Sequence, residues 1–407
     1  MKTIYKCRNI YTLDGKIDGY IIVNNGKIVD ITTEKQKADF DYSNKIIIPG
    51  IFDTHNHASG GYHPYGTSNK DRVYYNKMYL KNLARTGVTS VLATLFSTVA
   101  DQESIDVLTT LSKKIVNKKF DGATAVGINF EGPYLNRVGE GGKRYVPDPV
   151  DTKVLQQYID ICGNTLAEMG MAPELKNADK GTKLLLKNGV KVAMAHTDAK
   201  SQDAFKAFDR GVDISTHTCN VMVGIHHRNI GGLGAALMDD RCDCELICDG
   251  MHVCNDMLKL IFKLKSHDKI MMVSDSSSFE NLPKGKYVRD GHEEIFVNEK
   301  GFVLDTNGSL NGSSKPVIYG MKNIVENCGV SMEDAIKMAC YNPCKKFNLT
   351  NKGCLAKGKD ADFVVIDKNF KVYYTFNGGR KVYDYKVDTD LNNKDLVKCR
   401  VSKWERN

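Results

Sequence analysis

Short apolar segments that alternate with amphipathic helical segments dominate the middle of this 407-residue chain. The apolar segments are rich in β-branched residues: Ile46–Asp53, Val88–Thr94, Ala123–Phe130, Val190–Ala195, Val212–Thr216, Cys244–Asp249 and Ile270–Ser274, with an eighth expected near Phe302–Leu310. The helical segments are Tyr74–Arg85, Ile105–Asn117, Thr152–Met169, Asp203–Arg210 and Asp256–Lys265. Apolar strands that alternate with helices are typical of βα units around a parallel sheet. Seven or eight units in about 300 residues predict an α/β fold, a (β/α)8 TIM barrel, with an open doubly wound sheet as the alternative.

The two ends of the chain carry a different pattern, in which short strands are separated by turns. Tyr20–Val23 and Lys27–Val29 flank Asn24-Asn-Gly26, which predicts a hairpin. Three further strands are expected near the C-terminus: Phe363–Asp367, Val372–Phe376 and Lys381–Tyr385. We therefore predict a small β-sandwich domain built from both chain ends, residues 1–48 and 346–407, beside a barrel formed by residues 49–345.

Charge and cysteine usage narrow the classes of partner and compartment. The 57 Lys and Arg residues exceed the 49 Asp and Glu residues, but the excess of +8 is spread along the chain and there is one Trp. This argues against nucleic-acid binding, while a local cluster would suffice for a small anionic substrate. We expect no secretory signal and no membrane span, because no run approaches the ~20 apolar residues that a span needs. The 12 cysteines lack zinc-ribbon spacing, which favours a reducing, cytoplasmic setting.

Histidines and carboxylates follow the predicted strands at the point where each strand ends. They are His55, His57, Glu131, His196, His217, Asp249, His252 and Asp275. In a barrel these ends converge on one face, where the active site lies. Taken singly, each residue could equally be a structural hydrogen-bonding group or a helix N-cap. The joint pattern favours a hydrolytic metal site, since imidazole and carboxylate around an open position bind Zn²⁺ or a similar divalent ion.

Two further features bear on the chemistry of such a site. Asp275 ends an apolar strand and precedes Ser276-Ser-Ser278, so we expect it to move the proton between water and the leaving amine. His227 and Arg228 are cation candidates for a phosphate, although a solvated basic loop is the commoner role of such residues. The run Gly231-Gly-Leu-Gly234 lacks the G-x-G-x-x-G spacing of a dinucleotide site.

These motifs resemble those of the amidohydrolase superfamily. Pro49-Gly50-x-x-Asp53-x-His55-x-His57 is similar to its opening motif, and Gly353-Cys-Leu-Ala-x-Gly358-x-Asp360-Ala-Asp362 to its closing motif. More narrowly, the chain resembles the N-acetylglucosamine-6-phosphate deacetylase family. The segments that carry this resemblance are Phe130-Glu131-Gly-Pro133-Tyr134-Leu135, Ala195-His196-Thr197, Thr216-His217-x-x-Asn220-x-Met222, Asp249-Gly250-x-His252-Val253 and Gly308-Ser-Leu310-Asn311-Gly312-Ser313.

The resemblance implies a metal-dependent hydrolase that removes the acetyl group from an N-acetyl amino-sugar 6-phosphate, most readily N-acetyl-D-glucosamine 6-phosphate. It implies one ion held by Glu131, His196 and His217, a second carried by His55 and His57, and Asp275 as the catalytic base. Zn²⁺ is the expected ion, with Fe²⁺, Mn²⁺ or Co²⁺ as alternatives. The substrate contacts that it implies come from Asn220, Val221, His252, Leu310, Asn311 and Gly312. It also implies a homodimer in which Arg228 reaches the neighbouring subunit's site.

The chain departs from the family pattern in the loop after Glu131-Gly-Pro133. The family's histidine is missing from that loop, which reads Val138-Gly-Glu-Gly-Gly142-Lys143-Arg144. We therefore include Gly142 and Lys143 among the substrate-binding candidates, with Lys143 or Arg144 as the replacement cation. Two alternatives remain at this stage: a relative that acts on another N-acyl substrate, and a catalytically silent sugar-phosphate-binding protein.

Overall fold

An eight-stranded parallel sheet forms the centre of the computed structural model, which describes residues 2–65, 71–138, 143–144, 149–289, 293–308, 310 and 312–398. The strands, in spatial order, are β15 (Ile270–Val273), β14 (Asp243–Ile247), β13 (Ile214–Ser215), β12 (Lys191–Met194), β11 (Leu166–Met171), β8 (Thr124–Glu131), β7 (Val88–Phe96) and β6 (Ile51–Asn56). The first and last strands also adjoin, since Asp275 N donates to the His55 carbonyl at 2.9 Å and Ser274 Oγ donates to Asp53 Oδ2 at 2.5 Å. The sheet therefore closes into a barrel.

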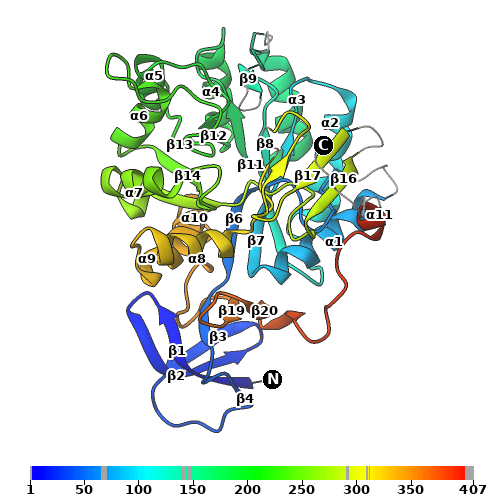
Figure 1. Cartoon of the computed structure of the whole chain (residues 1–407), viewed down its shortest axis with the longest axis vertical. Helices are drawn as coiled ribbons and strands as arrows, with labels where there is room; N and C mark the ends of the chain where they lie inside the picture. The colour runs from blue at the N-terminus through cyan, green and yellow to red at the C-terminus, as the bar shows by residue number, and fades with distance from the viewer. Residues whose placement is uncertain are drawn as a thin grey trace.

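One helix follows each barrel strand along the chain and packs outside the barrel, as Figure 1 shows. The helices are α1 (Arg72–Arg85), α2 (Gln102–Thr110), α3 (Thr152–Cys162), α4 (Ala178–Lys187), α5 (Ser201–Asp209), α6 (Gly231–Met238), α7 (Asn255–Leu264) and α8 (Val317–Asn327). Apolar strands need cover on their outer face, and the helices provide it. The predicted TIM barrel is confirmed.

One barrel strand differs from the prediction. The helix expected over Thr152–Met169 ends at Cys162, where Gly163 takes a left-handed φ of 54°, and Leu166–Met171 forms β11. The segment Leu-Ala-Glu-Met-Gly-Met contains no β-branched residue and therefore looks helical. Its place in the barrel requires Gly170, because a Cβ there would lie 2.9 Å from the Cβ of Ala195.

The segment near Phe302–Leu310, expected as the eighth barrel strand, lies outside the barrel. Val303–Leu304 forms β18, which joins β16 (Gly285–Arg289) and β17 (Glu293–Val297) in a separate three-stranded sheet. This small sheet follows β15 and precedes α8, so it is an insertion in the last βα unit.

The two chain ends combine into one mixed sheet below the barrel (Figure 1). Its strands are β1 (Lys2–Thr12), β2 (Gly15–Asn24), β3 (Lys27–Thr32), β4 (Phe40–Asp41), β5 (Ile46–Pro49), β19 (Phe363–Ile366), β20 (Val372–Asn377) and β21 (Arg380–Asp384). The sheet curls over its own core: the Tyr5 ring of β1 lies 5.1 Å from that of Phe363 and 5.2 Å from that of Phe376. The expected β-sandwich is thus a single sheet folded on itself. Asn24 pairs with Lys27 across the expected hairpin turn.

The chain passes from this sheet to the barrel and later returns to it. Gly50 links β5 to β6, and a Cβ there would lie 2.1 Å from Thr89 Oγ1. After β21 the chain runs back along α1, where Asn82 Nδ2 donates to the Leu391 carbonyl at 2.8 Å, and the last described element is α11 (Lys394–Lys398). The remaining helical segments are η1 (Leu111–Ile115), η2 (Gly163–Thr165), η3 (His267–Lys269), α9 (Met332–Ile336), η4 (Lys337–Tyr341) and α10 (Asn342–Lys346). Among the described residues, none of the helices is long and apolar enough to cross a lipid bilayer.

Candidate active site

The barrel strands aim the candidate residues at a common point by sharp turns at their ends. His196, His217 and Asp275 follow β12, β13 and β15, with φ values of 45°, 27° and 49°. Residues other than glycine rarely adopt such left-handed conformations, and those that do cluster at functional sites. Glu131 is the last residue of β8. These side chains therefore meet at the carboxyl end of the barrel.

Glu131, His196 and His217 form the first cluster that could hold a metal ion. His196 Nε2 lies 2.9 Å and His217 Nε2 lies 3.0 Å from Glu131 Oε1, and the two Nε2 atoms are 3.2 Å apart. All three side chains are buried. Three protein donors around a shared point match the ligand number of catalytic zinc sites.

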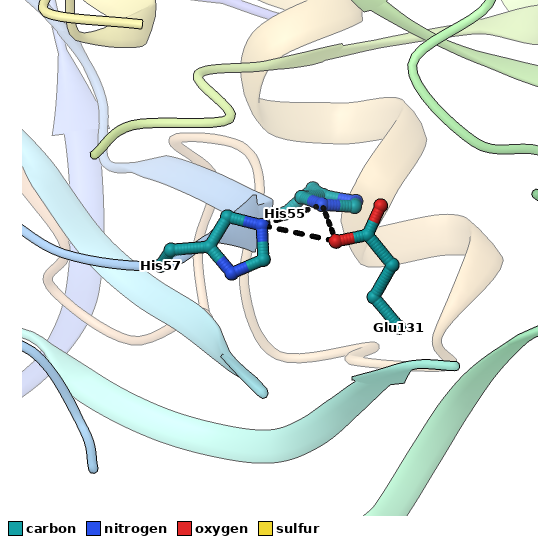
Figure 2. Close-up of side chains that lie close together, drawn as sticks. All are labelled: His55, His57 and Glu131. Carbon is teal, nitrogen blue, oxygen red and sulfur yellow. Dashed lines mark hydrogen bonds and ion pairs between the residues drawn. The ribbon is translucent and has the colours of Figure 1, made fainter. Parts of the chain in front are cut away.

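A second cluster comprises His55, His57 and the same Glu131. Figure 2 shows both rings near the second oxygen, Oε2, with His57 Nε2 at 3.1 Å and His55 Nε2 at 3.4 Å. Asp275 Oδ1 approaches this pair from β15, 3.3 Å from His57 Nε2 and 3.6 Å from His55 Nε2. Glu131 thus gives one oxygen to each cluster, which is the arrangement of a bridging ligand.

Hydrogen bonds behind the rings determine which nitrogen faces the clusters. His196 Nδ1 donates to the Arg137 carbonyl at 2.8 Å, because a carbonyl can only accept. His55 Nδ1 lies 3.2 Å from Glu245 Oε2, a carboxylate acceptor, and Thr54 Oγ1 donates to the other oxygen of Glu245 at 2.6 Å. With Nδ1 protonated, the neutral form of each of these two rings directs its Nε2 lone pair at Glu131.

His57 follows the same rule through a hydroxyl group. Its Nδ1 lies 3.1 Å from Tyr65 Oη, and Tyr65 donates its own proton to the Thr94 carbonyl at 3.1 Å. The Tyr65 oxygen therefore accepts from His57 Nδ1, so the Nε2 lone pair of His57 also faces the carboxylate. Lone pairs aimed at a carboxylate repel it unless a cation lies between them, and this donor set fits a divalent metal.

The pKa values of the buried histidines and of Asp275 also indicate that the site favours positive charge. Burial alone lowers the pKa of both histidines, but Glu131 and Glu245 outweigh it at His55, and Tyr65, Asp275 and Glu131 outweigh it at His57, so both pKa values lie well above the usual value. Burial raises the pKa of Asp275, yet its hydrogen bond to His57 and the nearby imidazoles lower that pKa to about 2. The two clusters therefore attract cationic charge, and Asp275 is ionised beside them.

Among the candidate substrate residues after β14 and β15, Gly312 lies close to Asp275. A Cβ on Gly312 would lie 2.9 Å from Ser277 Cβ and 3.5 Å from the Asp275 carbonyl, so only glycine allows this approach. Leu310 bridges to Leu304 in the neighbouring small sheet. His252 Nδ1 lies 2.8 Å from Asp249 Oδ2. Asp249 also accepts from Ser313 Oγ at 3.3 Å, and Ser313 N donates to the Asp275 carbonyl at 2.9 Å, so Ser313 connects the ends of β14 and β15 to this loop.

Asn220 and Val221 adjoin the first cluster, whereas Arg228 does not. Asn220 Nδ2 donates to the His217 carbonyl at 3.3 Å, and the Val221 carbonyl accepts from Thr197 N at 3.1 Å. Arg228 is exposed in the loop that precedes α6. No described carboxylate makes an ion pair with it.

The loop after Glu131-Gly-Pro133 is described only in part. Gly142 lies outside the described residues, as does Asn311, and for Lys143 and Arg144 the structure describes only the backbone. Lys143–Arg144 forms β10, which pairs with β9 (Arg137–Val138). Arg137 N donates to the His196 carbonyl at 3.1 Å, so this hairpin starts directly beside the first cluster.

Glu245 and Phe96 are two site residues that the sequence interpretation missed. Glu245 is fully buried in the middle of β14, within the apolar run Asp243-Cys-Glu-Leu-Ile247. A carboxylate in such a run is itself a signal, because buried charge is costly unless it has partners. Phe96 ends β7 at the barrel mouth, and nothing in its apolar strand distinguishes it from a core residue.

The family follows from a match over most of the chain. The model of the amidohydrolase family matches residues 46–382, which include both clusters, Asp275 and the closing motif. The chain belongs to the amidohydrolase family. In this amidohydrolase the two clusters and Asp275 are therefore the candidate metal centre and catalytic group.

Relatives of this amidohydrolase carry more specific names. An N-acetylglucosamine-6-phosphate deacetylase of Lysinibacillus sphaericus is 29% identical over 366 residues, 88% of this chain and 92% of the relative. An N-acetylgalactosamine-6-phosphate deacetylase of Escherichia coli O157:H7 is 28% identical over 384 residues, 91% and 97% of the two chains. These two relatives are named for the same reaction on different sugars.

A solved structure supports the fold. An N-acetyl-D-glucosamine-6-phosphate deacetylase mutant of Mycobacterium smegmatis, in complex with N-acetyl-D-glucosamine-6-phosphate, matches with a TM-score of 0.84 at 23% identity. The match covers 94% of this chain and 99% of that chain. The barrel and the sheet of the two chain ends are therefore shared architecture.

Proposed function

We propose that this amidohydrolase hydrolyses the acetamide of an N-acetyl amino-sugar 6-phosphate, giving acetate and the free amino-sugar phosphate, with N-acetyl-D-glucosamine 6-phosphate as the preferred substrate. The observation that carries the proposal is the position of Asp275 against two histidine clusters that share Glu131. The choice of an amino-sugar 6-phosphate as substrate rests on the names of the relatives.

The metal would be held by Glu131, His196 and His217, with a second ion at His55 and His57. When bound, a divalent ion such as Zn²⁺ lowers the pKa of water, so that the deprotonated form that attacks an amide is available at neutral pH. The ion also polarises the amide carbonyl. Glu245, Tyr65 and the Arg137 carbonyl fix the rings of His55, His57 and His196 so that the Nε2 atoms of these three histidines keep their lone pairs for this purpose.

Asp275 would carry the proton. Its carboxylate is ionised at neutral pH, and its side chain is 17% exposed, whereas that of Glu131 is 3% exposed. It can take a proton from the attacking water and return the same proton to the departing nitrogen, so no net proton is lost in the cycle. A protein that only bound the sugar phosphate would have no use for such a group.

The remaining candidates would bind the sugar and its phosphate. We assign the phosphate to Arg228, reaching across from a second copy of the chain, and to backbone groups near Asn220 and Val221. His252, held by Asp249, would contact the sugar, and Leu310, Asn311 and Gly312 would flank the acetamide. Gly142 and Lys143 would lie on the other side, from the hairpin that begins beside His196. We place the enzyme in the cytoplasm, in keeping with the eleven described cysteines, none of which is in a disulfide bond.

The test is an acetate-release assay on four sugars with metal-loaded protein. The substrates are N-acetyl-D-glucosamine and N-acetyl-D-galactosamine, each with and without a 6-phosphate. We expect the highest kcat/KM on N-acetyl-D-glucosamine 6-phosphate and a large loss without the phosphate. A preference for the galactosamine compound would correct the sugar, and equal rates without phosphate would point to another N-acyl substrate.

A further inference from the structure

An exposed aromatic side chain stands at the mouth of the barrel and has no part in the chemistry above. Phe96 is the last residue of β7, is 37% exposed, and pairs with Glu131 across the β7–β8 register. Its ring lies 6.4 Å from that of His57 and 5.8 Å from that of His196, centroid to centroid. Since these histidines belong to different clusters, the phenyl ring lies across the edge of both.

The exposure of the other side chains shows where a substrate can enter. His55 is fully buried, and Glu131 and His217 are nearly so, whereas the side chains of His57 and Asp275 are 18% and 17% exposed. The open side of the site is therefore the side of His57 and Asp275. Phe96 borders that opening through its contact with His57.

The planar geometry of an amide fixes the direction of the acyl chain once its oxygen and nitrogen are placed. The carbonyl carbon carries three groups in one plane: the oxygen, the nitrogen and the alkyl group. The oxygen has to face the clusters, and the nitrogen has to reach Asp275, which approaches His57 from β15. The alkyl group takes the third direction, and Phe96, on β7 on the other side of β6, offers an apolar surface there.

We propose that Phe96 forms the wall of the acyl pocket and limits the acyl group to about the size of acetyl. The inference rests on the proposed function and deepens it, since it names the residue that selects the acyl group rather than the sugar. A hydrophobic pocket discriminates by roughly 10- to 200-fold for one methylene. Phe96→Ala should therefore raise the ratio of kcat/KM for N-butanoyl over N-acetyl substrate by about tenfold or more.

The experiment compares N-acetyl-, N-propanoyl- and N-butanoyl-glucosamine 6-phosphate with wild type, Phe96→Ala and the milder Phe96→Leu. The matched control is Val99→Ala, an exposed apolar residue three positions further along the chain. Metal content and circular dichroism verify that each variant is folded and loaded. We expect graded acceptance of longer chains in the order Ala, Leu, Phe at position 96, and an unchanged ratio in the control.

Binding provides a second readout that does not depend on turnover. In an Asp275→Asn background, the Kd of the N-butanoyl compound should fall by about tenfold on adding Phe96→Ala, while the Kd of the N-acetyl compound should not fall. If wild type releases acetate but neither ratio moves in the Ala and Leu variants, the role of Phe96 is overturned and the proposed function stands. A wild type that hydrolyses none of the three compounds would end both.

Discussion

Asp275 contacts both histidines of the second cluster, and its substitution separates chemistry from binding. Asp275→Asn removes the group that accepts and returns the proton. General acid–base transfer is worth about 10²–10⁴-fold, so kcat should fall by that factor while KM changes only a few-fold. Steady-state kinetics beside the exposed control Asp256→Asn measure both. A variant with near-normal kcat would move the base elsewhere, with His252 as the next candidate.

Glu245 supports His55 from behind and should govern one cluster only. Glu245→Gln removes the charge that accepts from His55 Nδ1, and loss of such a partner typically weakens metal binding about 10–100-fold. We expect this loss at the His55–His57 cluster and not at the His196–His217 cluster. Equilibrium dialysis with metal analysis would show fewer ions per subunit at limiting metal.

A second buried acid provides the control for Glu245. Glu168 of β11 is equally buried, and burial raises its pKa well above the usual value. Replacing Glu168 by the neutral isostere Gln should therefore change the charge of the barrel interior little. Glu168→Gln should leave metal content as in wild type. Equal losses in both variants would mean that Glu245 acts through general stability rather than through His55.

Individual site residues were predictable where they follow a strand, and less so elsewhere. His55, His57, Glu131, His196 and His217 each stand after an apolar run, and the structure brings all five together. Glu245 lies inside such a run, where its side chain points to the barrel interior only because of the alternation of the strand. The height of Glu245 inside the barrel, and so its contact with His55, depends on the register of β14 with β13 and β15, which no local sequence pattern encodes.

At the scale of elements, seven barrel strands were predictable from their β-branched runs, but β11 was not. Its residues favour a helix, and its strand conformation follows from pairing with β8 on one side and β12 on the other. Tertiary pairing therefore decided the conformation of Leu166–Met171. The same limit explains the misplaced eighth strand, since the described pairing of Val303–Leu304 is with β17 and Leu310 and not with a barrel strand.

The loop that follows β15 carries a buried acid with a consequence for stability. Burial raises the pKa of Glu280 to about 8 from its usual 4.5, although the Ser59 hydroxyl acts in the opposite direction. Between these values the folded state holds a proton that the unfolded state releases, so stability falls as pH rises from about 4.5 to about 8. Glu280→Gln stays neutral and should escape this loss.

The prediction is a difference between two melting measurements. The Tm of Glu280→Gln relative to wild type should be higher at pH 8 than at pH 5, by about 2 °C or more. The exposed carboxylate variant Glu34→Gln serves as the control and should shift equally at both pH values. An equal shift of Glu280→Gln at both pH values would show that this carboxyl titrates normally in the folded protein.

At the scale of the whole molecule, the position of Arg228 bears on assembly. This exposed arginine lies on the loop before α6, and we expect it to bind the substrate phosphate of a neighbouring subunit. Arg228→Ala should raise KM for the 6-phosphate substrate about 10-fold or more, with kcat little changed, because charge-assisted hydrogen bonds contribute mostly to binding. The control is Arg210→Ala, an exposed arginine at the end of α5.

Assembly is checked in the same series by sedimentation at the assay concentration. We expect the protein to sediment as a dimer and to lose the phosphate preference when diluted to the monomer. A monomer with full activity and full phosphate preference would refute a contribution from a second subunit.

The central claim is that the two clusters sharing Glu131 hold the metal on which hydrolysis depends. The most direct measurement follows acetate release from N-acetyl-D-glucosamine 6-phosphate beside metal content, before and after chelation and on adding back a divalent ion. We predict that activity falls with the metal, returns in proportion to the ion bound, and is absent together with the metal in Glu131→Gln. Full activity in protein shown to be free of metal would contradict the account.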